Sequence, residues 1–497
     1  MSTGFRAVVR QLPAAARTKS RMEQVYLPVL AFATMLAAGT VLRLWHLSAS
    51  PAWQWDEAVY WRVAVNVQHG LLTEHPLRGV AWTPFLYQPP FYFLGLARWF
   101  SATGATIYHA RVLGVILTSG MLAMLFRLLW RIHGPGVALL AIIPVIFDGW
   151  LLYIERISFM ENALMVIIEA AFLLYQRALE RPSWQRIAAE GAAVGAAAVF
   201  KQTGAYVLLA ILLCWLIVRR NHREHLLLLG AAVTVVVIYV VAMTRMYDVP
   251  THDWFTSQSL VQIRRVLGLQ QSGGTLTSPG KLLHLLAAQY GLFMVSLLLG
   301  LAGVLVAARR LLQCYRARDW WPARGNALLF SWLVAGIAVY SLSSLKFPQY
   351  FVLILVPAYC YLWTELAEWD WRMAWKAAAV AAATLAGLAS FWLAVPAFRA
   401  NTLAQVQQYA AARIPSADVV VTEQTIGDLI QQPWCTVEYS VPCLHAAAYA
   451  ITWRTRLQSS TEQADAAFHR LMVGAVRVKT ISGAVGTATI WKLREGR

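Results

Sequence analysis

Residues 226–244 read LLLLGAAVTVVVIYVVAMT and contain no charged side chain. An α-helix needs about 20 apolar residues to cross the roughly 30 Å hydrocarbon core of a bilayer, so this stretch predicts a transmembrane helix. Comparable stretches recur along the chain up to about residue 396. We predict about eleven membrane spans, at residues 26–48, 110–130, 136–154, 161–178, 187–200, 203–218, 226–244, 285–307, 327–344, 347–364 and 376–396.

The composition of the whole chain agrees with a membrane protein. Of its 497 residues, 59% are hydrophobic and 13% are charged, and the mean hydropathy is +0.53. A soluble domain has roughly 25% charged residues, so the class of soluble proteins is excluded. The chain has 42 Lys and Arg against 24 Asp and Glu, a net charge of +18. We attribute this excess to membrane topology and expect no nucleic-acid partner.

The positions of Lys and Arg predict the orientation in the membrane, because cytoplasmic loops retain these residues. Cations gather in the N-terminal tail, residues 1–25, and in every second loop after it. The tail is therefore predicted to be cytoplasmic, and an odd number of spans places the C-terminus outside. We interpret the first span as an uncleaved signal anchor. The expected location is the cell (cytoplasmic or inner) membrane, as a multi-pass protein.

Three regions follow from this framework: the basic tail, a transmembrane domain over 26–396 that contains a long first outer loop at 49–109, and an extracytoplasmic domain over 397–497. The last region alternates helical and strand-like patterns, which predicts a small α/β domain. Its expected helices are 401–412, 425–431 and 460–472, and its expected strands are 418–422, 475–481 and 487–493. The fold class is thus an all-α polytopic membrane protein with a small C-terminal α/β domain.

Cys435 and Cys443 both lie in this C-terminal region, outside the membrane. Oxidation is permitted there, so we predict that they form a disulfide. The other three cysteines lie in or beside membrane spans without ligand spacing and are interpreted as small apolar residues.

The first outer loop opens with Trp53-Gln54-Trp55-Asp56-Glu57, two adjacent acids beside two indoles. A helix over residues 57–69 would place Arg62, Asn66 and His69 on one polar stripe, and such a helix would lie in the membrane interface. One acid at this position is explained equally well as a cap of that helix. A cap does not explain the second acid, nor a second acidic site at Glu161 on the same side of the membrane.

Several cations share this outer side. Singly, each is typical of a residue that snorkels to the interface. Together with the carboxylates they predict a site for an anionic, membrane-anchored substrate beside a general base. These cations are Arg111, Arg156, Lys201, Arg264, Arg265 and Lys346. Asp148 and Glu169 lie within predicted spans and rank below Asp56, because either can be paired structurally.

At these residues the sequence resembles the GT-C glycosyltransferases, in the group of the dolichyl-phosphate-mannose protein mannosyltransferases and the bacterial aminoarabinose transferases of lipid A. The likeness runs from about residue 40 to 365, and it lies in the order and membrane placement of several short features. These are Asp56-Glu57, Pro89-Pro90 with its aromatic followers, Arg111, Arg156 with Glu161, Lys201, and Lys346-Phe347-Pro348-Gln349-Tyr350 before Pro357.

Two positions depart from the family pattern. Tyr87-Gln88 stands before Pro89-Pro90, where the family often has His or Lys, and Glu161 stands where Asp is common. The Trp-Trp-Asp motif of the metal-dependent oligosaccharyltransferase branch is absent from the sequence. We therefore expect no metal and no other cofactor.

The resemblance implies an inverting transferase that moves a sugar from a polyprenyl-phosphate donor to a hydroxyl acceptor on the extracytoplasmic side. Asp56 would be the catalytic base, and Glu57 and Glu161 would orient or bind the acceptor. The remaining candidates are substrate-binding residues: Arg62, Arg111, Arg156, Lys201, Arg264, Lys346 and Tyr350. Membrane lipids are the other expected partners.

Two other classes remain open from the sequence. A transporter or flippase of lipid-linked sugars would also be polytopic and basic, although the chain has no convincing internal repeat. A non-catalytic assembly protein that binds polyprenyl lipids is the third alternative. The sequence also leaves open the sugar, the oligomeric state, and whether the acceptor is a protein, a glycolipid or a cell-wall glycan.

Overall fold

In the computed structural model, the chain folds into two compact units, and each unit is built from segments that are separated in the sequence. Unit 1 comprises Met1–Arg43, Ile116–Ile154 and Glu161–Phe391, and unit 2 comprises Leu44–Val115, Glu155–Met160 and Trp392–Arg497. The structure describes residues 26–48, 55–72, 88–218, 222–247, 293–317, 324–342, 348–397, 402–422, 424–427, 429–430, 432–435, 447–455, 472–483 and 486–493.

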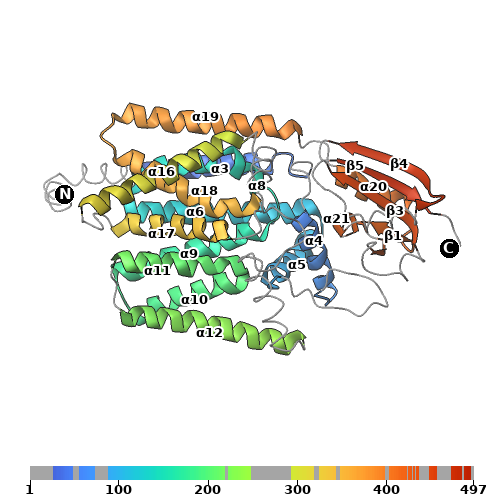
Figure 1. Cartoon of the computed structure of the whole chain (residues 1–497), viewed down its shortest axis with the longest axis horizontal. Coiled ribbons are helices and arrows are strands. Elements are labelled where there is room, and N and C mark those ends of the chain that lie inside the picture. The colour runs from blue at the N-terminus through green and yellow to red at the C-terminus, as the bar shows by residue number, and fades with distance from the viewer. Residues whose placement is uncertain are drawn as a thin grey trace. The chain divides into compact units, whose positions relative to one another are not determined.

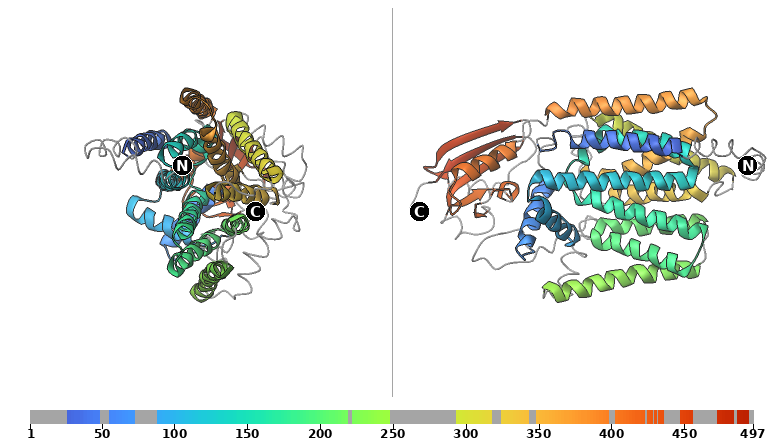
Figure 2. Two further views of the ribbon diagram at one scale, coloured as in Figure 1. Left: turned by 90° about the vertical axis from the view of Figure 1, so that its left-hand side faces the viewer. Right: turned by 180° about the vertical axis from the view of Figure 1, so that it is seen from behind.

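Unit 1 is built from helices that run roughly parallel to one another, and the end-on view shows them as a bundle (Figures 1 and 2). Each of the eleven predicted spans has a helical counterpart, which confirms the polytopic fold. The helices are α3 Leu27–Leu44, α6 Ile107–His133, α7 Pro135–Ile146, α8 Gly149–Ile154, α9 Met160–Glu180, α10 Trp184–Phe200, α11 Tyr206–Val218, α12 His222–Tyr247, α16 Met294–Ala317, α17 Arg324–Leu342, α18 Val352–Glu368 and α19 Met373–Ala397. The first part of α6, up to Val115, belongs to unit 2.

Six of the described helices, α3, α6, α9, α12, α16 and α19, are long and apolar enough to cross a membrane. On α12, large apolar side chains such as Leu226, Val237 and Ile238 are exposed. Exposed apolar surface of this extent is typical of a helix that faces lipid. In contrast, α18 is buried along nearly its whole length, as expected for a central helix of the bundle.

The third predicted span, 136–154, is wrong as a single helix, because it is broken between α7 and α8. Asp148 lies at the break, and its Oδ1 accepts a hydrogen bond of 2.9 Å from the backbone N–H of Leu151. Its Oδ2 accepts a hydrogen bond of 2.7 Å from the hydroxyl of Tyr359. Asp148 therefore satisfies a free N–H group at the start of α8, which an uninterrupted helix would not have exposed.

Helices α10 and α12 approach each other closely at Gly191 and Gly195, which together form a GxxxG motif. A Cβ atom on Gly191 would lie 2.3 Å from the carbonyl oxygen of Leu228, and one on Gly195 would lie 2.6 Å from that of Ala232. Any larger residue would push the two backbones apart. The glycines are therefore explained by packing alone.

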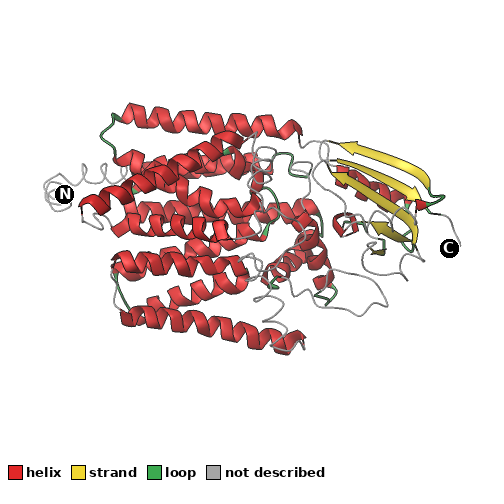
Figure 3. Cartoon of the chain, viewed as in Figure 1, coloured by secondary structure: helices red, strands yellow, loops and turns green. Residues whose placement is uncertain are grey.

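Unit 2 contains two short helices of the first outer loop, α4 Trp55–Gln68 and α5 Phe91–Thr103, together with the C-terminal segment. That segment forms a five-stranded sheet in the order β2-β1-β3-β5-β4, drawn in yellow in Figure 3. The pairs β1–β2 and β1–β3 are parallel, whereas β3–β5 and β5–β4 are antiparallel. The strands are β1 Val419–Thr422, β2 Trp434–Cys435, β3 Ala447–Thr455, β4 Val476–Gly483 and β5 Gly486–Lys492, and α20 Thr402–Arg413 packs on β4 and β5.

The C-terminal α/β prediction is confirmed for α20, β1, β4 and β5, each within about two residues. The predicted helix at 425–431 is reduced to one turn, α21 Gln424–Gly427. Strands β2 and β3 were not predicted from the sequence. The predicted helix at 460–472 and the predicted Cys435–Cys443 disulfide lie outside the residues or side chains that the structure describes.

Candidate active site

Helix α4 carries the two adjacent acids in its first turn. Acidic side chains are favoured at this position, since it is the positive end of the helix dipole. The helix predicted at 57–69 is confirmed as Trp55–Gln68. Of its expected polar stripe, Arg62 and Asn66 are buried and His69 is exposed. The buried part of the stripe is thus directed into protein and does not form a polar surface.

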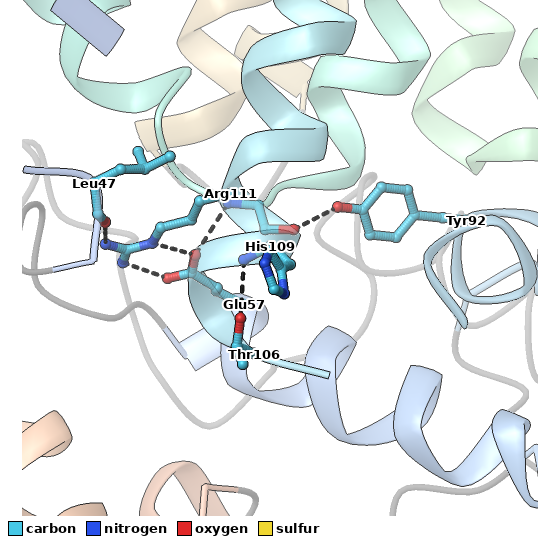
Figure 4. Close-up of polar contacts among 7 residues, drawn as sticks. Leu47, Glu57, Tyr92, Thr106, His109 and Arg111 are labelled. Carbon is cyan, nitrogen blue, oxygen red and sulfur yellow. Dashed lines mark hydrogen bonds and ion pairs between the residues drawn. The ribbon is translucent and has the colours of Figure 1, made fainter. Parts of the chain in front are cut away.

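Glu57 forms a bidentate ion pair with Arg111 of α6 (Figure 4). The Nε and Nη2 atoms of Arg111 donate to Oε1 and Oε2 of Glu57, each at 2.7 Å, and both side chains are fully buried. Nη1 of Arg111 donates to the carbonyl oxygen of Leu47 at 2.9 Å, and Glu57 Oε1 also accepts the backbone N–H of Ser158 at 3.1 Å. Paired, multiply hydrogen-bonded charges of this kind hold their elements in one geometry.

The neighbouring acid has a different environment. Asp56 is partly exposed, whereas Glu57 is fully buried. Consecutive residues of a helix point in directions about 100° apart, so one acid can face inward while the next faces outward. The two acids are therefore distinguished by accessibility, which the sequence alone does not reveal.

A pair of hydroxyl groups that the sequence does not indicate lies beside this ion pair. The hydroxyl groups of Tyr92, on α5, and Ser158 share a buried hydrogen bond of 2.8 Å. Tyr92 also packs edge-on against Tyr60 of α4, with ring centroids 5.6 Å apart. The segment Glu155–Met160 is thereby tied to both short helices. In the sequence, only the run of aromatic residues after Pro90 points to Tyr92 as a candidate. Nothing in the sequence points to Ser158.

Two further predicted substrate ligands in unit 2 contact backbone carbonyl groups. Arg156 is buried and donates from Nη2 to the carbonyl oxygen of Trp45. Arg62 is buried on α4 and donates from Nη2 to the carbonyl oxygen of Ile430, in the C-terminal segment. Together with the Arg111–Leu47 bond, these contacts link segments of unit 2 that are distant in the sequence.

In unit 1, the structure brings together three other predicted residues. Nζ of Lys201 donates to Oε1 of Glu161 at 2.6 Å, and both side chains are almost completely buried. Nζ also lies 5.3 Å from the centroid of the Tyr350 ring, within the range of a cation–π interaction. Oε2 of Glu161 is buried and accepts no hydrogen bond among the described residues. This arrangement combines a cation, an open acceptor atom and an aromatic ring.

The local chain path explains how Lys201 reaches this position. Lys201 ends α10 in an extended conformation, with φ −153° and ψ 138°. The short 3₁₀ helix η2, Gln202–Ala205, follows immediately. A Cβ atom on Gly204 would lie 2.1 Å from the carbonyl oxygen of Ala197, so only glycine fits this turn. Tyr350 comes from a second 3₁₀ helix, η5 Pro348–Phe351.

Two of the predicted ligands, Arg264 and Lys346, lie outside the described residues. Within the described part of the chain, no group of three or more His, Cys, Asp or Glu side chains is arranged to hold a metal ion. The expectation that no metal is required stays a prediction.

Comparison with known proteins bears on the fold. The family model described as dolichyl-phosphate-mannose-protein mannosyltransferase matches residues 87–245, and no curated protein sequence matches the chain. The structure of ArnT from Cupriavidus metallidurans bound to undecaprenyl phosphate is similar, with a TM-score of 0.65, 12% identity, and coverage of 92% of this chain and 97% of that chain.

A second solved structure is also similar over most of the chain. It is the Archaeoglobus fulgidus oligosaccharyltransferase in complex with Zn and sulfate, with a TM-score of 0.54, 12% identity, and coverage of 84% of this chain and 67% of that chain. At 12% sequence identity, the similarity to these two structures establishes the fold of this chain. The chain is therefore a multi-pass membrane protein with the GT-C fold that the sequence resemblance predicts.

Proposed function

We propose that this chain is an integral-membrane glycosyltransferase that moves a sugar from a polyprenyl-phosphate donor to a hydroxyl acceptor, with inversion at the sugar carbon. The fold and the family-model match support this class of enzyme. The similar ArnT structure holds undecaprenyl phosphate, which supports a donor of that chemical class. The observation on which the proposal rests is the partly exposed Asp56 beside the buried Glu57–Arg111 pair.

In this proposal Asp56 is the general base. Its carboxylate takes the proton from the acceptor hydroxyl as the hydroxyl oxygen attacks the sugar carbon that bears the phosphate. The bond between that carbon and the phosphate oxygen breaks, and the electron pair leaves with the polyprenyl phosphate. A phosphate leaves as an anion without being protonated, so one carboxylate suffices for a single displacement with inversion.

Glu57 and Arg111 have a positioning role in this proposal. Because Glu57 already accepts three hydrogen bonds, from Arg111 and Ser158, it is poorly placed to act as a second base. Its ion pair instead fixes the first turn of α4 and with it the backbone of Asp56. Arg62 and Arg156, which donate to backbone carbonyl groups, serve the same purpose in this interpretation.

Lys201, Glu161 and Tyr350 are proposed as substrate ligands. The ammonium group of Lys201 has three N–H donors, of which Glu161 takes one. The others suit the oxygens of a phosphate, and the buried Oε2 of Glu161 suits a sugar or acceptor hydroxyl. A buried ion pair is costly to desolvate, and ionisable groups retained in a membrane domain mark functional sites by default. Lys346 and Arg264 remain candidates for the phosphate side.

The proposal also includes the location. Sugar transfer is placed at the extracytoplasmic face of the cell membrane, with the basic tail of residues 1–25 in the cytoplasm, because alternate loops carry the excess of Lys and Arg.

The test is release of free polyprenyl phosphate by the purified full chain, reconstituted in lipid with a panel of polyprenyl-phosphate sugars and a crude membrane fraction as acceptor. Wild type is compared with Asp56→Asn, which keeps the shape and removes the basicity. Asp418→Asn, in the C-terminal segment, is the matched control. One donor should be consumed by wild type and the control, and turnover should fall about 10²–10⁴-fold in Asp56→Asn.

Near-wild-type turnover of Asp56→Asn would refute the assignment of the base. If no donor is consumed but labelled lipid-linked sugar crosses the bilayer, the chain is a transporter and the enzyme hypothesis is refuted. Binding of the lipid-linked sugar without transfer or transport would instead support the hypothesis of a non-catalytic assembly protein.

A further inference from the structure

The outer surface of α5 carries a hollow that the proposed reaction does not use. It has a volume of about 490 Å³ and is lined by Gly95, Arg98, Trp99, Ser101, Ala102 and Leu113. Five of these residues come from α5, and Leu113 comes from the first turns of α6. A volume of this size is within the range of small-molecule sites.

Small residues on one side of α5 keep the hollow open. The helix buries Tyr92, Phe93, Leu96, Ala97 and Phe100 on its other side. A Cβ atom placed on Gly95 would meet nothing within 4 Å. Glycine inside a helix costs roughly 0.5–1 kcal/mol relative to alanine, and here neither a close backbone approach nor a positive φ requires it. Its effect at this position is to leave space.

Hydrogen bonds fix the walls of the hollow. Trp99 donates from Nε1 to the carbonyl oxygen of His109 at 2.8 Å, which attaches its indole to α6. Ser101 donates to the carbonyl oxygen of Ala97 at 3.0 Å and accepts a hydrogen bond of 3.2 Å from the side chain of Gln68. Two side chains that line the hollow, those of Trp99 and Ser101, are therefore held in place.

Arg98 supplies a cation in the hollow. Its side chain is exposed, and among the described residues it makes no hydrogen bond and no ion pair. Three other arginines of unit 2, Arg62, Arg111 and Arg156, are instead buried and donate hydrogen bonds to protein groups. A planar guanidinium with unused donors matches the paired oxygens of a phosphate group.

The surroundings of the hollow are apolar. Phe91 and Leu94 are 43% and 38% exposed on α5, and they precede Gly95 and Arg98 on the same side of the helix at helical spacing. Leu113 belongs to α6, which is long and apolar enough to cross a membrane. An indole and an arginine next to exposed apolar side chains are typical of the boundary between lipid tails and headgroups.

We propose that this hollow binds the phosphate headgroup of an anionic membrane phospholipid. The guanidinium of Arg98 pairs with the phosphate, the hollow left by Gly95 and Ala102 takes the headgroup, and the acyl chains lie along Phe91, Leu94 and Leu113. Charge and apolar surface meet here, which favours a lipid over a free anion. The site depends on the membrane location and not on sugar transfer, so the two proposals can fail independently.

Native mass spectrometry of the purified full chain in detergent tests this. The protein is titrated with dioleoylphosphatidylglycerol or with zwitterionic dioleoylphosphatidylcholine. Arg98→Gln removes the charge. Gly95→Leu places a side chain in the hollow, at a position where an added Cβ meets nothing within 4 Å. The matched controls are Arg245→Gln, at an exposed arginine near the end of α12, and Gly230→Ala, at a helical glycine that also has open space around it.

Wild type and both controls should retain one phosphatidylglycerol that Arg98→Gln and Gly95→Leu lose or bind about 10- to 100-fold more weakly. Circular dichroism spectra identical to wild type establish that the variants fold. Equal phosphatidylglycerol retention in all five proteins overturns the site. Equal retention of phosphatidylcholine overturns the recognition of charge, and displacement of phosphatidylglycerol by millimolar inorganic phosphate overturns the assignment to a lipid.

Discussion

Arg111 and Glu57 face each other through two parallel hydrogen bonds of 2.7 Å, and neither side chain is accessible to solvent. Removing one partner leaves an uncompensated buried charge, which typically destabilises a protein by about 3–5 kcal/mol. We expect Arg111→Met to lower the thermal unfolding midpoint strongly in detergent. The double variant Glu57→Gln/Arg111→Met should recover part of that loss. Additive losses in the double variant would show that the pair is not coupled.

Lys201 provides a test of the phosphate side. Lys201→Met removes the ammonium group, and we expect the KM for the lipid-linked donor to rise about 10- to 100-fold, the effect of losing a charged hydrogen bond. Because this change also strands the carboxylate of Glu161, Glu161→Gln/Lys201→Met is measured beside it. A donor KM that is unchanged in the double variant, with the fold retained, would make the pair structural only.

The α10–α12 contact predicts opposite effects for two glycine substitutions. Gly191→Ala places a methyl group 2.3 Å from a backbone carbonyl oxygen and should destabilise the bundle by about 1–3 kcal/mol. Gly230→Ala meets nothing within 4 Å and should stabilise it by about 0.5–1 kcal/mol. The thermal unfolding midpoints of both variants, measured in the same detergent, show whether each substitution stabilises or destabilises the protein. Equal shifts would contradict the close approach.

Tyr359 donates to the buried carboxylate of Asp148 at the break between α7 and α8. Tyr359→Phe removes this donor and should cost about 1–3 kcal/mol of stability. Turnover measured below the unfolding temperature should stay near wild type, because the contact supports the broken span and not the reaction. A loss of turnover without a loss of stability would move Asp148 into the functional site.

The predicted bond between Cys435 and Cys443 can be checked directly. Protease digestion of the native full chain without reductant should yield one linked pair of peptides, and treatment with a reductant should separate them by mass. Recovery of both thiols alkylated before reduction would refute the pairing.

Much of the helical architecture could be predicted, because lipid forces each spanning segment into a helix and sequence length then measures the span. The exception at 136–154 depends on a contact between residues that are far apart in the sequence. In the sequence, Asp148 is one polar residue inside an apolar stretch. Only the contact with Tyr359, far along the chain, shows why the helix is interrupted at Asp148. Strand β3 was missed for a related reason, since its pairing with β1 and β5 comes from distant segments.

At the candidate site, the sequence identified which residues carry charge, and it could not say which of them already have partners. Asp56 and Glu57 are equivalent as sequence, and burial distinguishes them. The partners of Arg62 and Arg156 are backbone carbonyl groups, which leave no trace in residue identity. The ion pair between Glu161 and Lys201 was not predicted either, although both residues were singled out as charges at the outer ends of apolar spans.

Unit 2 joins the loop that bears Asp56 to a segment that begins at Trp392. During synthesis the ribosome makes residues 116–391 in between, which at about 5–20 residues per second takes on the order of tens of seconds. Throughout that interval the loop lacks the segment that supplies the carbonyl of Ile430 to Arg62. Completion of the candidate site therefore waits until the C-terminal segment has been made, and a product terminated before Ile430 would lack this contact.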